Sequence, residues 1–482
     1  MAQELAVSNL KTHLEFLHDL VQQFKKSGYQ LALVGGCVRD AILGRAINDL
    51  DLTTDAKPEY VKKLLNSWAD NVWDIGADFG TIAGKKKDTQ IEITTYRSDL
   101  YQEHSRKPEI AFSEKIEEDL IRRDFTINSM ALELTVDGFK LIDPFGGVND
   151  LAKKIIKTPT EPSISFNEDP LRTLRAARFA AQLGFNIENQ TLQAITEFRE
   201  RLKIVSAERI RDEFNKLILG EFPRNGLKIL VETKLADQFI PEIPLLKLEI
   251  DEHHHHKDVY EHTLTVLEQA INLEKKLGEH DLVLRLAALF HDVGKPKTRQ
   301  LLSGGGVAFH HHEVVGSKMT KARLKELRYD SQTIDLVSQL VFLHLRFHGY
   351  GSGEWSDSAV RRYVRDAGEN LPRLHLLTRA DCTTRNLKKA AQLSQNYDDL
   401  ENRIEELQKT EELSRIRPEL DGQQIMNLLN LKPSKAVGIA YDFLMEIRLD
   451  QGLLGEEEIT KILLAWWKTN GENILAEVSK EK

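Results

Sequence analysis

Two aspartates separated by one residue follow a glycine pair early in the chain. Asp49 and Asp51 alternate with Leu50 and Leu52, and side chains two positions apart in a β-strand point to the same face. The two carboxylates therefore converge while the leucines face a core. Such a pair can hold two divalent ions for an in-line attack on a nucleoside triphosphate. One ion would activate the attacking hydroxyl and the other would steady the departing pyrophosphate.

The glycine pair and a third carboxylate fit the same chemistry. Gly35-Gly36 ends the apolar run Leu31–Val34, and the backbone amides of such a turn can face a phosphate. Glu92 lies on the polar face of a predicted strand and would complete the set of carboxylates. An Asp-x-Asp pair alone is weak evidence, because two aspartates on an exposed strand face are more often a solvated edge. The surrounding motifs must decide between a metal-binding pair and a solvated strand edge.

These residues need a sheet to position them, and the first 150 residues predict a small mixed one. Apolar residues between 10 and 27 recur at helical spacing and predict an amphipathic helix. The run Leu31–Val34, the Gly turn, a helix at Cys37–Leu43 and period-two residues at Asp49–Leu52 give strand, turn, helix and strand. Further strands are predicted at Thr81–Ala83, Gln90–Tyr96 and Ala131–Leu134. The predicted fold class is α+β.

Beyond about residue 150 the chain is predicted to be almost wholly helical, and changes in composition divide it. Asp143–Gly147 closes the sheet-rich part, Thr158–Pro162 is a linker, and a Pro-bounded acidic segment with His253–His256 precedes a histidine-rich block. We therefore predict a head at residues 1–150 and a helical neck at 151–250. The histidine-rich block at 257–386 and a helical tail at 387–482 complete the chain.

Composition excludes several classes of protein. The 482 residues include 41% apolar and 29% charged residues with only 13 Pro, which is ordinary globular usage. The net charge of -9 argues against a protein that coats nucleic acid nonspecifically. Cys37 and Cys382 lie far apart, so a disulfide framework is not expected. The first residues lack the pattern of a signal peptide, and no apolar stretch is long enough to span a bilayer. We therefore expect a cytoplasmic protein without a membrane partner.

Five motifs in order resemble the class II tRNA nucleotidyltransferase and bacterial poly(A) polymerase family. They are Leu33-Val-Gly-Gly-Cys-Val-Arg-Asp40 with Asn48-Asp-Leu-Asp-Leu-Thr-Thr54, Arg122–Ala131, Asp143–Gly147, Glu168-Asp-Pro-Leu-Arg172 and Ala207–Arg211. The resemblance implies catalytic carboxylates at Asp49, Asp51 and Glu92, with Mg²⁺ held by the two aspartates. It implies nucleotide-binding residues at Gly35, Gly36, Arg39, Arg123, Asp124, Asn128, Asp169, Arg172, Arg175 and Arg178. Arg123 and Asp124 would meet the sugar hydroxyls.

The Glu168–Arg172 motif suggests how two bases could be chosen without a template. Cytosine and adenine each place an amino donor beside a ring-nitrogen acceptor, whereas uracil and guanine place a carbonyl beside a ring N–H. By the resemblance, Asp169 would accept from the amino group and Arg172 would donate to the ring nitrogen. Alternatively, Asp169-Pro170 is a helix start, and Arg172, Arg175 and Arg178 are a solvated face of the helix Leu171–Leu183.

The histidine-rich block resembles the HD domain. The match rests on Val259-Tyr-Glu-His262, on Leu289-Phe-His-Asp-Val-Gly-Lys295 and on Arg379-Ala-Asp381. The resemblance implies that His262, His291, Asp292 and Asp381 bind a divalent transition metal such as Mn²⁺ or Ni²⁺ for phosphate ester hydrolysis. His312 and His344 match positions that some members use for a second metal. The block is alternatively a helical scaffold with weak activity.

The resemblance implies an enzyme that adds CCA to the 3' end of tRNA from CTP and ATP, with a second, phosphohydrolase activity. The tail motifs Asp421–Met426 and Leu431–Gly438 look like the RNA-holding body of actinobacterial-type members with an HD domain. A poly(A) polymerase shares the head motifs, so the sequence leaves the two activities open. An HD phosphohydrolase with an RNA-positioning head and a non-enzymatic RNA-binding protein are further alternatives. The sequence does not define the oligomeric state.

Overall fold

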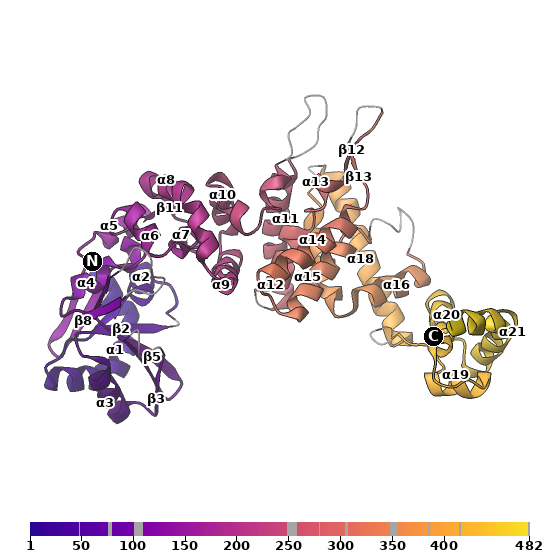
Figure 1. The fold of residues 1–482 in the computed structure, drawn as a ribbon, viewed down its shortest axis with the longest axis horizontal. Helices are drawn as coiled ribbons and strands as arrows, with labels where there is room; N and C mark the ends of the chain where they lie inside the picture. The colour runs from indigo at the N-terminus through magenta and orange to yellow at the C-terminus, as the bar shows by residue number, and fades with distance from the viewer. Residues whose placement is uncertain are drawn as a thin grey trace. The chain divides into compact units, whose positions relative to one another are not determined.

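The computed structural model forms two compact units, Met1–Pro241 and Glu242–Lys482. It describes residues 1–47, 49–75, 80–100, 109–247, 258–278, 280–303, 307–347, 355–383, 386–413 and 416–480. The histidine run at 253–256 and residues 101–108 lie outside the described residues. Figure 1 shows the chain from the head, in indigo, to the tail, in yellow.

The head is built on a seven-stranded sheet in the order β3-β4-β5-β2-β1-β8-β9. The strands are β1 (Ala32–Val34), β2 (Leu50–Thr54), β3 (Asn71–Asp74), β4 (Thr81–Lys86), β5 (Thr89–Thr95), β8 (Ala131–Thr135) and β9 (Gly138–Ile142). β2 and β5 run parallel and the other neighbours run antiparallel. The sheet is therefore mixed, which confirms the predicted α+β class. β6 (Arg97–Leu100) and β7 (Glu109–Phe112) form a separate antiparallel pair.

Helices pack on this sheet through their apolar stripes. They are α1 (Ala2–Lys26), α2 (Gly36–Leu43), α3 (Pro58–Trp68) and α4 (Ile116–Ile121). α5 (Gly147–Lys153) follows the sheet and contacts the residues Thr126–Asn128 and the later strand β10 (Ile155–Ile156). α1 buries Leu10, Leu14, Leu17 and Phe24 along one side, as the helical spacing predicts. α2 begins directly after β1, because Gly35 has φ +77° and turns the chain. The sheet carries Asp51 and Glu92, and the β1–α2 turn lies beside them in the strand order.

The rest of the first unit is mostly helical. It contains α6 (Pro162–Glu168), α7 (Leu171–Leu183), α8 (Asn189–Phe198), α9 (Ala207–Ile218) and α10 (Pro223–Glu232). α7 has the bounds that the sequence predicts. The expectation of an almost wholly helical chain misses a short parallel pair, β10 (Ile155–Ile156) with β11 (Asn186–Ile187). This pair joins the end of the head to the residues after α7.

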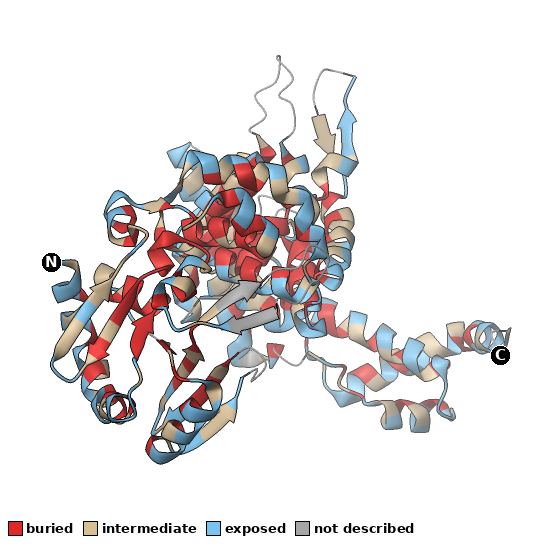
Figure 2. Ribbon diagram, turned by 60° about the vertical axis from the view of Figure 1, so that its left-hand side comes forward, coloured by how far each residue is buried: buried red, intermediate tan, exposed pale blue. Residues whose placement is uncertain are grey.

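The second unit carries the histidine-rich block and the tail. The block contains α11 (Val259–Leu273), α12 (Leu282–Phe290), α13 (Lys295–Thr298), α14 (His312–Glu326), α15 (Ser331–Leu343), α16 (Asp357–Ala367) and α17 (Leu371–Asp381). The hairpin β12 (Arg299–Leu301) and β13 (Val307–Phe309) interrupts the helices. α18 (Leu387–Thr410), α19 (Gly422–Leu429), α20 (Lys435–Gln451) and α21 (Glu456–Lys480) follow. In Figure 2 buried residues mark both the strands of the sheet and the inner faces of the helices.

Candidate active sites

The carboxylates of the head lie at neighbouring positions of two paired strands. Asp51 of β2 is in register with Glu92 of β5, so the two side chains emerge side by side on one face of the sheet. Leu50 and Leu52 are buried on the other face, as predicted. Asp49 lies one residue before β2 and is exposed. Burial raises the pKa of Asp51, and the charges of Glu92 and Asp49 raise it further.

Arg123 is the cation beside these carboxylates. Its charge opposes the rise in the pKa of Asp51. A Cβ atom placed on Gly35 would lie 3.1 Å from Arg123 Nη1, so the guanidinium rests against the glycine turn. Only glycine fits here without a shift of Arg123, and the positive φ of Gly35 adds to that restriction. The turn, the cation and the carboxylates thus form one surface suited to a polyphosphate.

Asp119 holds this cation in place, and the sequence reasoning missed it. Asp119 is fully buried on α4. Its Oδ2 accepts from Arg123 Nη2 at 3.0 Å, and its Oδ1 accepts from Arg122 Nη2 at 2.6 Å. Burial alone would raise the pKa of Asp119, but the two guanidiniums outweigh it and the pKa is lowered. Two arginines three and four residues after an acid on a short helix were the available signal.

The predicted sugar-contacting residues form a network inside the protein. Asp124 is buried, and its Oδ1 accepts from Asn128 Nδ2 at 2.9 Å. Arg39 Nη1 in turn donates to Asn128 Oδ1 at 2.7 Å, and Arg39 forms a bidentate pair with Asp40. The structure therefore brings Arg39, Asp124 and Asn128 together at the start of α2. A sugar contact by Asp124 stays a prediction.

α7 turns its arginines toward the protein. Arg172 and Arg178 are only 7% exposed, so the alternative of a solvated arginine face is wrong for these two. Arg175 donates to Asp124 Oδ2. Glu213 of α9, which the sequence reasoning also missed, pairs with Arg175 at 3.2 Å and with Arg178 at 2.6 Å. The pKa of Arg178 is lowered to about 10 by burial and by Arg175.

The side chains predicted to read the base are fixed before any nucleotide binds. Arg172 Nη1 donates to Ser165 Oγ at 2.8 Å and to Glu168 Oε2 at 3.2 Å, and Nη2 donates to the carbonyl of Arg122. Asp169 Oδ1 accepts from the backbone N–H of Leu171 at 3.1 Å. The aspartate therefore also supports the start of α7, as the alternative interpretation proposed. Its Oδ2 pairs with Arg209 of α9 at 3.1 Å.

The second unit brings six potential metal ligands together from three helices and from the residues that follow α12 and α15. His262 lies on α11, His291 and Asp292 follow α12, His312 begins α14, His344 follows α15 and Asp381 ends α17. His291, His312 and His344 each bond through Nδ1 to the carbonyl three residues earlier, at 2.7–2.8 Å. His262 Nδ1 contacts Thr383 Oγ1 at 3.1 Å. These bonds direct the Nε2 atoms inward, as partners of metal-binding histidines do.

The six ligands form two groups, and Asp292 contacts members of both. His262, His291 and Asp381 form one group, and Asp292, His312 and His344 form the other. Asp292 Oδ2 lies 3.1 Å from His291 Nε2, and Asp292 Oδ1 lies 3.3 Å from His312 Nε2. Lys295 Nζ also donates to Oδ2 at 2.6 Å. One carboxylate therefore faces both groups with different oxygens.

The donor set fits divalent metals. His312 Nε2 and His344 Nε2 are buried and have no hydrogen-bond partner among the described residues, and such orphaned atoms are costly unless something binds them. Burial lowers the pKa of His344 to about 4, so its imidazole is neutral near pH 7, the form that binds metal. Within the described part of the chain, both groups with three ligand atoms inside 4.8 Å lie here. The head carboxylates do not meet that spacing.

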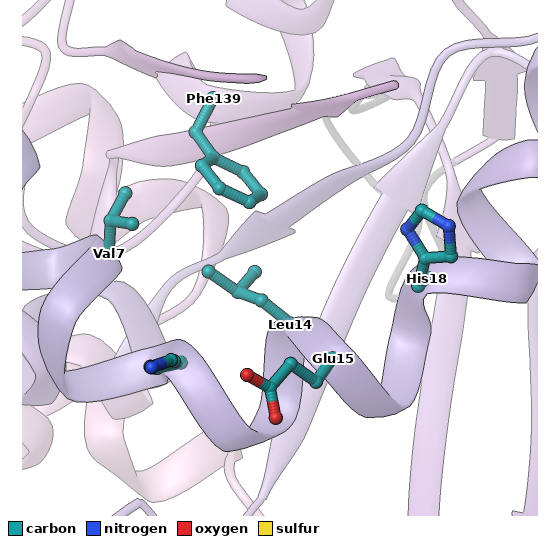
Figure 3. Close-up of a pocket in the computed structure, with 6 residues that line it drawn as sticks. Val7, Leu14, Glu15, His18 and Phe139 are labelled. Atoms are coloured by element: carbon teal, nitrogen blue, oxygen red, sulfur yellow. The ribbon is translucent and has the colours of Figure 1, made fainter. Parts of the chain in front are cut away.

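A cavity elsewhere in the head is separate from these residues. It measures about 450 Å³ and is bordered by Val7, Leu14, Glu15 and His18 of α1 and by Phe139 of β9. Figure 3 shows the Phe139 ring facing Leu14, with Glu15 and His18 on different sides of Leu14. The described lining includes none of the predicted site residues.

In the described residues, no helix combines the length and hydropathy needed to cross a bilayer.

Comparison with protein families assigns these parts. Residues 31–157 match the poly A polymerase head domain, and residues 184–246 match the probable RNA and SrmB-binding site of polymerase A. Residues 31–157 are therefore similar to the poly A polymerase head domain. Residues 259–386 match the HD domain, which includes all six ligands of the second unit. Nucleotidyltransferase and HD domains generally use divalent metals.

Curated relatives are similar to part of this chain. The chain is 40% identical over 225 residues to a CCA-adding enzyme of Enterococcus faecalis, covering 46% of this chain and 53% of the relative. It is 42% identical over 214 residues to a CCA-adding enzyme of Bacillus subtilis, covering 44% and 52%. The matched part of this chain thus spans about half the length of these relatives.

Solved structures show the same fold over nearly the whole chain. The CCA-adding enzyme of Bacillus stearothermophilus in complex with CTP aligns with a TM-score of 0.69 at 24% identity, over 96% of this chain and 99% of that one. The Thermotoga maritima CCA-adding enzyme complexed with tRNA_CCA aligns with a TM-score of 0.60 at 20% identity, over 96% and 97%. At these sequence identities, the comparison shows that the chains share a fold and shows nothing further.

Proposed function

We propose that this chain adds the 3'-terminal CCA to tRNA from CTP and ATP. The observation that carries the proposal is the fixed pair Asp169 and Arg172 at the start of α7. Each of these side chains is held by neighbouring groups, so an acceptor and a donor are presented in a set arrangement. Cytosine and adenine offer the matching amino donor and ring-nitrogen acceptor, whereas uracil and guanine do not.

The chain's own residues divide the work of nucleotide transfer. Asp49 and Asp51 would hold two Mg²⁺ ions, with Glu92 in support, and Mg²⁺ supplies Lewis-acid stabilisation of the transferring phosphoryl group. Arg123, fixed by Asp119 against the glycine turn, neutralises the triphosphate. Arg39, Asn128, Asp124 and Arg175 are joined by hydrogen bonds, and Glu213 links Arg175 to Arg178. This network would hold the nucleotide site rigid. A mismatched base would leave Asp169 or Arg172 without its partner, which costs about 1 to 3 kcal/mol per group.

The test is extension of a tRNA that lacks its 3' CCA, read at single-nucleotide resolution with Mg²⁺. We expect two C residues with CTP alone and a stop after one A with both nucleotides. Continued addition of many A residues would identify a poly(A) polymerase, which shares the head motifs.

Asp49→Ala and Asp51→Ala should both abolish addition in folded protein, and retained addition in both would contradict the proposed catalytic pair. Arg172→Ala should lose discrimination against UTP and GTP.

We propose a second activity, metal-dependent hydrolysis of phosphate esters, for the HD domain. The support is the six-ligand cluster with its orphaned Nε2 atoms. His262, His291, Asp292, Asp381, His312 and His344 would hold Mn²⁺ or Ni²⁺, since imidazole with carboxylate suits these ions. Asp292→Ala should stop ester hydrolysis without changing nucleotide addition. We place both activities in the cytoplasm, where the two cysteines would stay reduced, as both are free thiols in the structure.

A further inference from the structure

One row of residues crosses the head sheet from the carboxylates to the edge strand β3. Asp51 is in register with Glu92, Glu92 with Ala83, and Ala83 with Trp73. Residues directly opposite each other on paired strands point to the same face of a sheet. These four side chains therefore share a face across β2, β5, β4 and β3. At about 4.8 Å between neighbouring strands, the row spans about 14 Å.

The row lies on the face of the sheet opposite α3. Gly84 points to the other face, where a Cβ atom on it would lie 3.3 Å from Leu65 of α3. Lys86 points the same way as Gly84, and its Nζ lies over the ring of Trp68 of α3. Since neighbouring residues of β4 alternate between faces, Ala83 and its partner Trp73 are directed away from α3.

Trp73 carries an aromatic ring that is partly exposed on this face. Within the described part of the chain, the ring makes no contact with another aromatic ring or with a cation. Ala83, between Trp73 and Glu92, is buried and has only a methyl group, so no bulky side chain of the row separates the two. A tryptophan ring that solvent reaches is a surface on which a nucleic-acid base can stack.

Lys85 adds a positive charge to the neighbouring row of the same face. It is exposed, and it forms no ion pair with the described residues. Its register partners, Asn71 of β3 and Gln90 of β5, are exposed as well. Gln90 Nε2 donates to Glu92 Oε1 at 3.4 Å, which connects this polar row to the carboxylates. A lysine without an acidic partner suits a phosphate of a nucleic-acid strand.

The geometry of in-line attack indicates which substrate lies over these strands. β1, with the glycine turn that follows it, flanks β2 on one side, and β5 flanks β2 on the other. The triphosphate would bind at the turn, beside Arg123. An in-line displacement places the attacking hydroxyl opposite the leaving pyrophosphate, so the 3' hydroxyl of the RNA would approach over Glu92. The nucleotides behind that hydroxyl would then lie over β4 and β3.

We propose that Trp73 and Lys85 form the acceptor subsite for the 3' end of the RNA. The ring of Trp73 would stack on a base close behind the attacking nucleotide, and Lys85 would contact a phosphate of the same strand. Stacking tolerates any base, which suits an acceptor whose last bases change with each addition. The proposal rests on the proposed nucleotide addition and names the part of the head that holds the acceptor.

Addition of the second C to a tRNA that already carries the first C tests the stacking residue. Trp73→Ala should lower kcat/KM for tRNA by about ten-fold, the size of one lost base stack, and leave KM for CTP unchanged. Trp73→Phe should keep most of the wild-type value, because it retains an aromatic ring. The matched control is Tyr60→Ala, since Tyr60 is a 50% exposed aromatic residue on α3. An unchanged kcat/KM for tRNA in Trp73→Ala would overturn the stack.

The salt dependence of the same reaction tests the phosphate contact of Lys85. The logarithm of the affinity for a single strand falls with the logarithm of the salt concentration, with a slope of about 0.7 per contacted phosphate. Lys85→Gln should make the slope of kcat/KM for tRNA shallower by about 0.7, which a purely structural role would not do. Lys86→Gln is the matched control, because Lys86 Nζ lies 4.5 Å from the centre of the Trp68 ring on the other face. Equal slopes for Lys85→Gln and the wild type would overturn the contact.

Photocrosslinking locates the acceptor without turnover. A tRNA that carries the first C, with 4-thiouridine as the nucleotide before it, is irradiated with the full chain, Mg²⁺ and a non-hydrolysable CTP analogue. We expect labelled peptides from β3 or β4, and less label in Trp73→Ala. Labelling confined to other elements would overturn the subsite. Labelling of β3 or β4 in a chain that extends no RNA would contradict the proposed addition but not the subsite.

Discussion

The carboxylate of Asp124 accepts two hydrogen bonds from the guanidinium of Arg175, at 2.8 Å from Nε and 2.5 Å from Nη2. Asp124 belongs to the head and Arg175 to α7, so this pair fastens the head to the helix that carries the predicted base-reading residues. Glu213 extends the link from Arg175 to α9. Asn128 extends it on the other side to Arg39 at the glycine turn. Both bonds from Arg175 reach Asp124 Oδ2, and charge-assisted hydrogen bonds of this kind are stronger than those between neutral groups.

Replacing Arg175 with methionine should therefore destabilise the first unit and weaken nucleotide addition. Asp124 would be left buried without its charged partner, which costs about 2 kcal/mol or more. We expect this loss in the free energy of unfolding by urea, with a rise in KM for both CTP and ATP. The matched control is Lys62→Met, because the Lys62 and Asp74 side chains are 47% and 40% exposed. That pair should contribute less than about 1 kcal/mol, and equal effects of the two changes would contradict the role of Arg175.

The ionised carboxylate of Asp124 should also make the stability of the first unit depend on pH. Burial alone would raise its pKa, but Arg175 and Asn128 outweigh burial and hold the pKa well below its usual range. An aspartate in the unfolded chain titrates near about 4. The stability that ionised Asp124 provides is therefore complete above about pH 4 and is lost as the pH falls toward the folded pKa. The stability difference between the wild type and Asp124→Asn should be constant from about pH 7 to 5 and shrink below about 4. A constant difference down to pH 3 would contradict this linkage.

Local patterns predicted much of this site, and long-range partners account for what they missed. The period-two alternation placed Asp51 on one face of β2 and Leu50 on the other, as the structure has them. The bounds of α7 also followed from its sequence. The spacing of Arg122 and Arg123 after Asp119 indicated an ion pair, but the burial of Asp119 and Glu213 could not be predicted, since acids on helices are usually exposed. The arginine partners of Glu213 lie on α7 and meet it only when α9 packs against that helix.

Local sequence patterns also fail to show how the arginines of α7 and the residues of the second unit pack. Helical spacing shows that Arg172, Arg175 and Arg178 share a face of α7, but it does not show whether that face meets water or protein. The six HD ligands were chosen by resemblance and do converge. The hydrogen bonds that orient their rings come from carbonyls three residues earlier, which no sequence pattern marks.

Glu92 offers a direct test of the third carboxylate in the head. Its register with Asp51 predicts that Glu92→Gln lowers kcat for nucleotide addition, by about ten-fold or more, because a supporting charge near the ions is lost. Glu133→Gln on β8 of the same sheet is the matched control and should leave kcat unchanged. Single-turnover extension of tRNA would separate the chemical step from product release. Equal rates for Glu92→Gln and the wild type would remove Glu92 from the catalytic set.

His312 tests whether the HD domain binds two ions. Asp292 faces His291 with one oxygen and His312 with the other, so the two groups of ligands can each hold an ion with Asp292 between them. His312→Ala should lower the Mn²⁺ content from two ions per chain to one, because a donor is lost from one group only. His311→Ala is the matched control, since the neighbouring His311 side chain is 83% exposed. Metal content is measured after equilibrium dialysis, without reference to activity. Two bound ions in His312→Ala, or one in the wild type, would contradict the two-ion arrangement.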